Sequence, residues 1–283
     1  MAFTLVVTLC LVASLSAAKF DIKFAQKMFP LAAGAYSDDP LQCIKNHFEG
    51  YDGTRGQLFF YENRAPCDGF ENDCYGYLAT LTRQMAIVIS FRGTNTGSQL
   101  RTELITSGHM VPMGSGKVSW YFYNAFSKVW GDDAKGVKGL ERAFKDQIKK
   151  HPDYEIWVTG HSLGGAMASL AAYHIAITYK IPKRIKLVTF GEPRTGDAEY
   201  AIDFNKKIDY AFRVVNGRDP VPHVPPFKPY SHHKYEVWFK DGMDPLTKPI
   251  VCIGEEEHRK KTENVDNPGK YTLIGMSRAF CRR

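Results

Sequence analysis

The sequence lacks several features that would point to other classes of protein. It has no Asn-x-Ser/Thr site, so N-glycosylation is not expected. It has no nucleic-acid-binding motif, no internal repeat and no linker, and its 283 residues are enough for one domain with a sizeable core. The formal net charge of +7 comes from Lys and Arg residues spread along the chain. Such a spread favours a solvated basic surface over a site for nucleic acid or an anionic polymer.

Charged side chains are also absent from residues 1–18. This segment has an apolar run from Phe3 to Leu15 and ends in the small residues Ser16, Ala17 and Ala18. A buried helix or a membrane anchor is the alternative, but the run is shorter than the roughly 20 residues that span a bilayer. The pattern therefore predicts a signal peptide over 1–18, a single mature domain over 19–283, and secretion.

Cysteines are few, and removing the signal peptide would take Cys10 with it. The five that remain are Cys43, Cys67, Cys74, Cys252 and Cys281. In an oxidising compartment the local pair Cys67–Cys74 is predicted to close a short polar loop. Three thiols are then left for at most one further bridge, and the sequence does not say which two form it.

One stretch carries the strongest chemical signal. Residues 155–159 are β-prone, 160–165 are rich in glycine, and 166–172 are strong helix formers. This is the strand–turn–helix context of a G-x-S-x-G nucleophile elbow, which would lift the Ser162 hydroxyl clear of a sheet. The Leu163 amide would start the helix and face an oxyanion. The alternative is a glycine-rich turn without chemistry.

The neighbouring His161 is expected to be a packed or hydrogen-bonded turn residue rather than a base, because adjacent side chains in such a turn diverge.

Elsewhere, helical and strand patterns alternate along the chain, and residues 87–89 form an apolar run typical of a strand buried on both faces. Residues 110–118, with two glycines and a proline, are expected to form a loop. The fold class predicted is α/β, with a mostly parallel sheet flanked by helices. The predicted strands are 57–62, 75–82, 85–91, 185–190, 210–216 and 234–240, and the predicted helices are 20–31, 134–150 and 196–207.

Four separated motifs occur in an order that chance does not readily produce. They are Phe91-Arg92-Gly93-Thr94, the turn at 160–165, Phe190-Gly191-Glu192-Pro193-Arg194, and the proline-rich stretch 219–226 that begins with Asp219. Together they make the chain resemble the class 3 (fungal-type) lipases, which have the α/β-hydrolase fold. The resemblance covers roughly residues 24–239.

The resemblance implies a role for each matching position. Ser162 would be the nucleophile, Asp219 would orient a catalytic histidine, and Thr94 with the Leu163 amide would form the oxyanion hole. The segment after Thr94 would be a lid, and no metal or organic cofactor is implied. An Asp before a Pro is also a common turn former, which is the structural alternative for Asp219.

The catalytic histidine is the point at which the chain departs from the family. Family members place it in an Asp-His-x-x-Tyr-Phe-like stretch, whereas this chain has His258 in an acidic segment and no histidine after it. His258 is the candidate by order along the chain, and the tail 254–283 is atypical. Three other histidines follow Asp219, one in the proline-rich loop and two before the last predicted strand: His223, His232 and His233.

The resulting prediction is a secreted, monomeric serine carboxylic ester hydrolase, a triacylglycerol lipase of lipid catabolism. It would act on a lipid ester at an interface, without nucleic acid or a stable protein partner. Phospholipids and cell-wall phenolic esters are rival substrates for the same chemistry. The alternative function is a lipase-fold protein that binds lipid but has lost its catalytic histidine.

Overall fold

The computed structural model describes residues 19–48, 50, 57–67, 73–94, 108–132, 136, 138–243 and 247–253. Three predictions fall outside these residues. They are the signal peptide over 1–18, the lid after Thr94, and the tail that carries His258.

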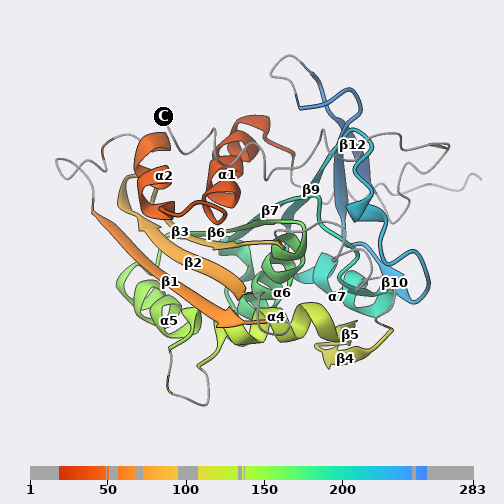
Figure 1. Cartoon of the computed structure of the whole chain (residues 1–283), viewed down its shortest axis with the longest axis horizontal. Coiled ribbons are helices and arrows are strands. Elements are labelled where there is room, and N and C mark those ends of the chain that lie inside the picture. The colour runs from red at the N-terminus through yellow and green to blue at the C-terminus, as the bar shows by residue number, and fades with distance from the viewer. Residues whose placement is uncertain are drawn as a thin grey trace, which may run out of the picture.

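A central eight-stranded sheet organises the fold, in the order β1-β2-β3-β6-β7-β9-β11-β12 (Figure 1). The strands are β1 (Leu58–Pro66), β2 (Asp73–Leu81), β3 (Ala86–Phe91), β6 (Glu155–His161), β7 (Ile185–Phe190), β9 (Tyr210–Asn216), β11 (Tyr235–Phe239) and β12 (Ile250–Ile253). Neighbours from β3 to β11 run parallel, while β1, β2 and β12 pair antiparallel at the two edges. The predicted α/β sheet flanked by helices is confirmed, and its edges make it mixed.

Helices cover both faces of this sheet (Figure 1). They are α1 (Ile22–Gly34), α2 (Pro40–His47), α4 (Trp120–Trp130), α5 (Leu140–Lys150), α6 (Leu163–Thr178) and α7 (Ala198–Lys207). One apolar core lies between the sheet and α4 to α7, and a second lies between the sheet and α1 with α2. Strand β3 serves both cores, because Ile87 and Ile89 face the first and Val88 faces the second. The prediction of a strand buried on both faces is therefore confirmed.

The expected loop over 110–118 is wrong. These residues form the hairpin of β4 (Met110–Met113) and β5 (Gly116–Ser119), part of a small four-stranded sheet with β8 (Gly196–Asp197) and β10 (Tyr230–Ser231). Gly114 lies in the two-residue turn with a φ of +61°, which a glycine adopts readily. Pro112 is tolerated because β4 is the edge strand of this sheet. The glycines and the proline therefore shape a hairpin rather than exclude one.

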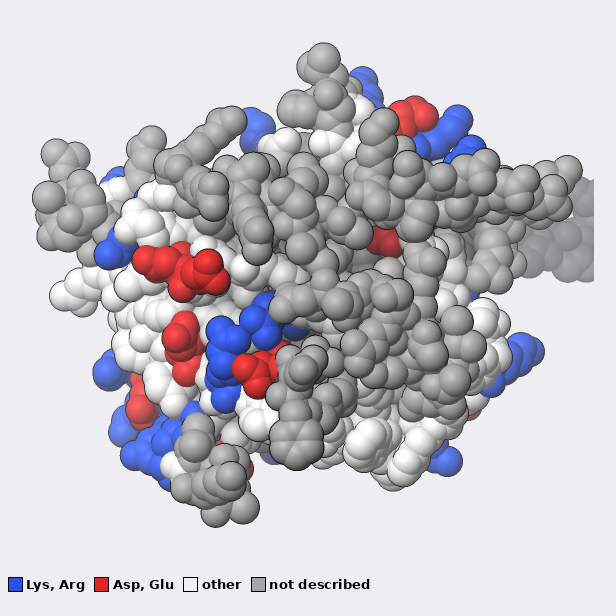
Figure 2. All heavy atoms as spheres, viewed as in Figure 1, with Lys and Arg blue, Asp and Glu red and all other residues white. Residues whose placement is uncertain are grey.

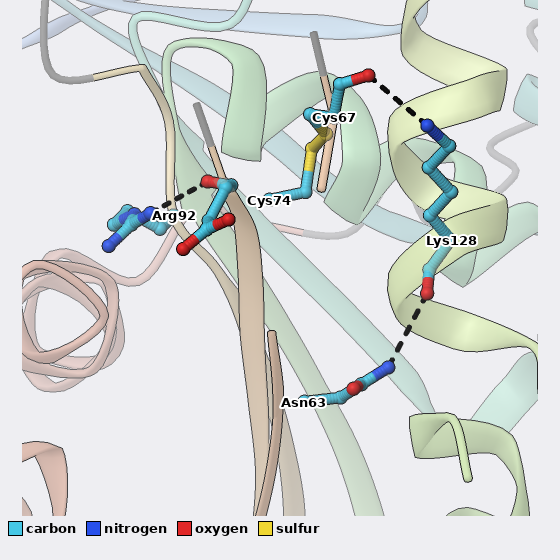
Figure 3. Close-up of a disulfide and its surroundings, with 6 residues drawn as sticks. Asn63, Cys67, Cys74, Arg92 and Lys128 are labelled. Carbon is cyan, nitrogen blue, oxygen red and sulfur yellow. Dashed lines mark hydrogen bonds between the residues drawn. A yellow bond between two sulfur atoms is a disulfide. The ribbon is translucent and has the colours of Figure 1, made fainter. Parts of the chain in front are cut away.

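The predicted disulfide between Cys67 and Cys74 is present and joins the ends of β1 and β2 (Figure 3). Lys128 of α4 donates to the Cys67 carbonyl over 3.2 Å, which ties this corner to the helix layer. Cys43 is also disulfide-bonded, whereas Cys252 is a free and buried thiol.

Surface charges of both signs are mixed on the face shown in Figure 2. One exposed ion pair joins Arg64 to Asp73, with the guanidinium 3.6 Å from the carboxylate. Within the described ranges no helix is long and apolar enough to cross a bilayer, and no group of three or more His, Cys, Asp or Glu side chains could hold a metal ion. On this face the charge pattern is that of a mixed solvated surface.

Helix α6 is expected to carry much of the stability. Leu170 in this helix is fully buried, so Leu170→Ala should lower the free energy of unfolding by about 2 to 5 kcal/mol. The control is Ile202→Ala in α7, where the side chain is 44% exposed and the change should be within about 0.5 kcal/mol. Urea unfolding of both variants measures the difference, and equal losses would contradict the described packing.

Candidate active site

The turn between β6 and α6 places Ser162 in a strained conformation at the carboxyl end of a central strand. Its backbone angles are φ 58° and ψ −127°, outside the regions that non-glycine residues favour. Ser162 occupies the N-cap position of α6, yet its side chain makes no capping hydrogen bond. Aspartates cap α1, α2 and α7 through their side chains, so the difference at α6 leaves the serine hydroxyl uncommitted to the helix.

Glycines make this turn possible because backbone passes very close to backbone there. A methyl group added at Gly164 would collide with the Phe91 carbonyl oxygen of β3, and one at Gly160 would collide with the Gly164 carbonyl oxygen. The first turn of α6 therefore packs directly against the end of β3. Only glycine fits at both positions.

The end of β3 brings a hydroxyl and an amide toward Ser162. A methyl group added at Gly93 would lie 3.1 Å from Ser162 Cβ, so the residue before Thr94 touches the elbow. Thr94 Oγ1 is buried and has no hydrogen-bond partner among the described residues. The Leu163 amide opens α6, where no preceding helical carbonyl can accept its proton. A hydroxyl that is buried without a partner among the described residues and a helix-terminal amide are the kinds of donor that an oxyanion requires.

Asp219 follows β9 and reaches the same edge of the sheet. One carboxylate oxygen, Oδ1, accepts from the Val221 amide over 3.0 Å, which is the turn-forming role given above as the alternative. The other, Oδ2, lies 2.6 Å from the position that a side-chain carbon on Gly191 would occupy, and the His161 ring lies 3.6 Å from that position. Forming the turn and orienting a catalytic histidine are compatible roles for Asp219, because the first uses Oδ1 and the second would use Oδ2.

His161 is buried and hydrogen-bonded, as the sequence predicted for a turn residue. Its Nδ1 lies 2.8 Å from the Tyr36 hydroxyl. Burial lowers the pKa of His161 to about 4, which keeps the ring neutral near pH 7. A neutral buried imidazole avoids placing a charge beside the elbow.

The sequence analysis missed a buried network behind the site. Glu192 is fully buried and accepts from Thr189 over 2.6 Å and from Thr195 over 3.1 Å, and it pairs with His233 Nε2 over 2.9 Å. Arg194 donates to the carbonyls of the loop after Asp219, at 2.8 Å and 2.5 Å. The Gly-Glu-Pro-Arg motif in the sequence was the available signal, since it placed both polar side chains immediately after a buried strand.

None of the described histidines hydrogen-bonds the Ser162 hydroxyl. His232 and His233 are buried, and their Nε2 atoms bond to the Pro222 carbonyl and to Glu192. His258, the candidate base, lies outside the described residues. Of the predicted residues, Ser162 and Leu163 are adjacent at the start of α6, Thr94 follows the Gly93 that approaches Ser162, and Asp219 lies on the side of His161.

The buried neutral His161 should make stability depend on pH. Its pKa of about 4 lies below the value of 6.5 for an exposed histidine. Between these two values the unfolded chain is protonated at His161 and the native state is not. The free energy of unfolding therefore does not depend on His161 titration above pH 6.5, and it falls by about 3 kcal/mol through this group as the pH drops to 4. Urea unfolding at pH 7 and pH 4 should therefore show a smaller loss for His161→Gln than for the unaltered protein. Equal losses in the two proteins would contradict the assignment.

Comparison with known proteins agrees with this geometry. The family model described as Lipase (class 3) matches residues 88–228. A lipase of Caenorhabditis elegans is 32% identical over 265 residues, which cover 84% of this chain and 71% of that protein. A lipase of Rhizopus niveus is 30% identical over 198 residues, covering 69% of this chain and 48% of that protein, so the chain spans about half the length of this fungal relative.

Solved structures give the same result. Lipase II from Rhizopus niveus has a TM-score of 0.68 and 27% identity, with 83% of this chain and 85% of that one covered. The lipase from Rhizopus microsporus var. chinensis also has a TM-score of 0.68 and 27% identity, with coverage of 83% and 79%. The described fold and the sequence matches together show that the chain belongs to the class 3 lipase family.

Proposed function

We propose that the protein is a secreted serine carboxylic ester hydrolase, a triacylglycerol lipase, with Ser162 as its nucleophile. The observation that carries the proposal is the strained Ser162 at the start of α6, with Gly93 close against it and the next hydroxyl, that of Thr94, buried without a partner among the described residues. Strain at one residue and an orphaned buried donor next to it each cost stability, and both are typical of sites that are built for a reaction.

The chemistry is acyl transfer. Ser162 Oγ attacks the ester carbonyl carbon, and its proton passes to a histidine nitrogen. The oxyanion then accepts from the Thr94 hydroxyl and the Leu163 amide. Collapse of the tetrahedral intermediate returns the proton to the leaving alcohol and leaves an acyl-enzyme, which water hydrolyses by the same steps. Asp219 Oδ2, at the same edge of the sheet, would orient the histidine and stabilise its charged form.

His258 is the proposed base, because it follows Asp219 in the order Ser, Asp, His that α/β-hydrolases use. The burial of His232 and His233, and the partners of their Nε2 atoms, support this choice. Their rings are committed to the network behind the site.

The substrate class and location rest on relatives and on the sequence. A protein of Fusarium solani named secreted mono- and diacylglycerol lipase 1 is 32% identical over 193 residues, covering 63% of this chain and 52% of that protein. This supports acylglycerol esters as the substrate. The predicted signal peptide over 1–18 supports secretion of the domain 19–283, and the protein is proposed to act as a monomer at a lipid interface.

A serine-directed fluorophosphonate tests the nucleophile. The wild-type protein should be labelled, and Ser162→Ala should lose both the label and ester hydrolysis, with kcat lower by about 10⁶-fold. Ser169→Ala is the matched control, because Ser169 lies in the same helix but hydrogen-bonds Tyr200 instead. Label that persists in Ser162→Ala would contradict the proposal. A folded wild-type protein without label or hydrolysis would favour the lipid-binding alternative.

A histidine comparison tests the base. His258→Ala should reduce tributyrin hydrolysis to the level of Ser162→Ala, because no group would remain to take the serine proton. His151→Ala is the control, since His151 precedes β6 at the end of the strand opposite the elbow. If His258→Ala hydrolyses tributyrin at the wild-type rate, another residue is the base.

A further inference from the structure

The Tyr36 hydroxyl joins three separate parts of the chain at the candidate site. Tyr36 follows α1 by two residues, and its ring lies against the His161 ring with centroids 5.7 Å apart. The hydroxyl oxygen accepts from the Gly93 amide over 2.9 Å and lies 2.8 Å from His161 Nδ1. One oxygen atom therefore links the N-terminal helix, the end of β3 and the elbow.

The direction of these hydrogen bonds follows from the charge states. Burial raises the pKa of Tyr36 above its usual range and lowers that of His161 to about 4, so both groups are neutral near pH 7. The hydroxyl has one proton, and the closer acceptor is His161 Nδ1, because the His161 carbonyl oxygen is 3.4 Å away. Tyr36 thus donates to His161 and accepts from Gly93, which places the imidazole proton on Nε2.

Gly93 is held in a space that admits no side chain. A methyl group there would collide with the Tyr36 hydroxyl and would lie 2.5 Å from the His161 carbonyl oxygen. The Gly93 backbone is therefore fixed between Tyr36 and the elbow. Since Thr94 is the next residue, the hydrogen bond from the Gly93 amide to Tyr36 also restrains the backbone that carries the Thr94 hydroxyl, which has no partner among the described residues.

We propose that Tyr36 is a positioning residue of the oxyanion site, which sets the Thr94 hydroxyl against Ser162 through the Gly93 amide. The proposal rests on the proposed function, since it presupposes that Thr94 donates to an oxyanion. Donors in such a site stabilise a transition state only when they are placed before the reaction begins. The hydrogen bonds of Tyr36 run to Gly93 and His161, on either side of the site, and none runs to Ser162.

Tyr36→Phe removes one oxygen atom and keeps the ring. The expected result is a kcat lower by roughly 10- to 100-fold with KM within about twofold, because the loss concerns the transition state alone. Affinity for a trifluoromethyl ketone, which forms the tetrahedral adduct, should fall by a similar factor. Binding of a non-reactive ether analogue of the substrate should not change.

Two further variants separate positioning from loosening of the fold. Tyr77→Phe removes a comparable buried hydrogen bond, which the Tyr77 hydroxyl of β2 donates to the Leu31 carbonyl of α1 over 2.6 Å. This bond also holds α1, but it does not reach the elbow. The Tyr77→Phe variant should retain wild-type kcat. On a Thr94→Val background, Tyr36→Phe should have a much smaller effect on kcat, since the hydroxyl that it positions is absent.

Three outcomes would overturn the proposal. An active wild-type protein whose kcat and ketone affinity survive Tyr36→Phe would overturn it and leave the proposed function intact. Equal losses of kcat in Tyr36→Phe and Tyr77→Phe would assign the effect to α1 packing. A wild-type protein without Ser162-dependent hydrolysis would overturn both proposals.

Discussion

The close contact of backbone with backbone, where the first turn of α6 meets the end of β3, is the constraint on which the site depends. The contact exists because Gly160, Gly93 and Gly164 leave no side chain in the way. The serine between strand and helix has a φ of 58°, and the contact brings Gly93, the residue before Thr94, close to that serine. The strain is held by the surrounding parallel strands, which are buried on both sides and cannot relax.

The buried titratable side chains nearest the elbow are neutral. Near the elbow, His161 and Tyr36 are both kept uncharged by burial, so the fields at Ser162 come from the α6 terminus and the Asp219 carboxylate. Farther back, Glu192 is compensated by two threonine hydroxyls and His233. The positive amide terminus of α6 favours negative charge that develops at the serine, and the neutral His161 adds no charge of its own.

The central strands could be predicted from local patterns, because a strand that is buried on both faces, such as β3 or β7, has a run of mainly apolar residues. The predicted strands 185–190 and 210–216 match the observed bounds. The hairpin at 110–119 was not predicted, since its glycines and proline also suit a loop and only pairing with β8 distinguishes the two. Helix α2 and strand β12 were not predicted either, because each is short and therefore leaves little periodic pattern in the sequence.

By itself the sequence determined the family, the α/β order of elements, the Cys67–Cys74 bridge and the identity of the elbow, because each can be recognised from short runs of neighbouring residues, four such runs in the case of the family. Only the tertiary structure decided what surrounds the elbow. The two orientations of the Asp219 oxygens, the unpartnered Thr94 hydroxyl and the Tyr36 bridge all depend on segments that meet across the sheet. Such contacts leave no periodic mark in the sequence, because one hydroxyl placed by folding satisfies groups that are more than fifty residues away.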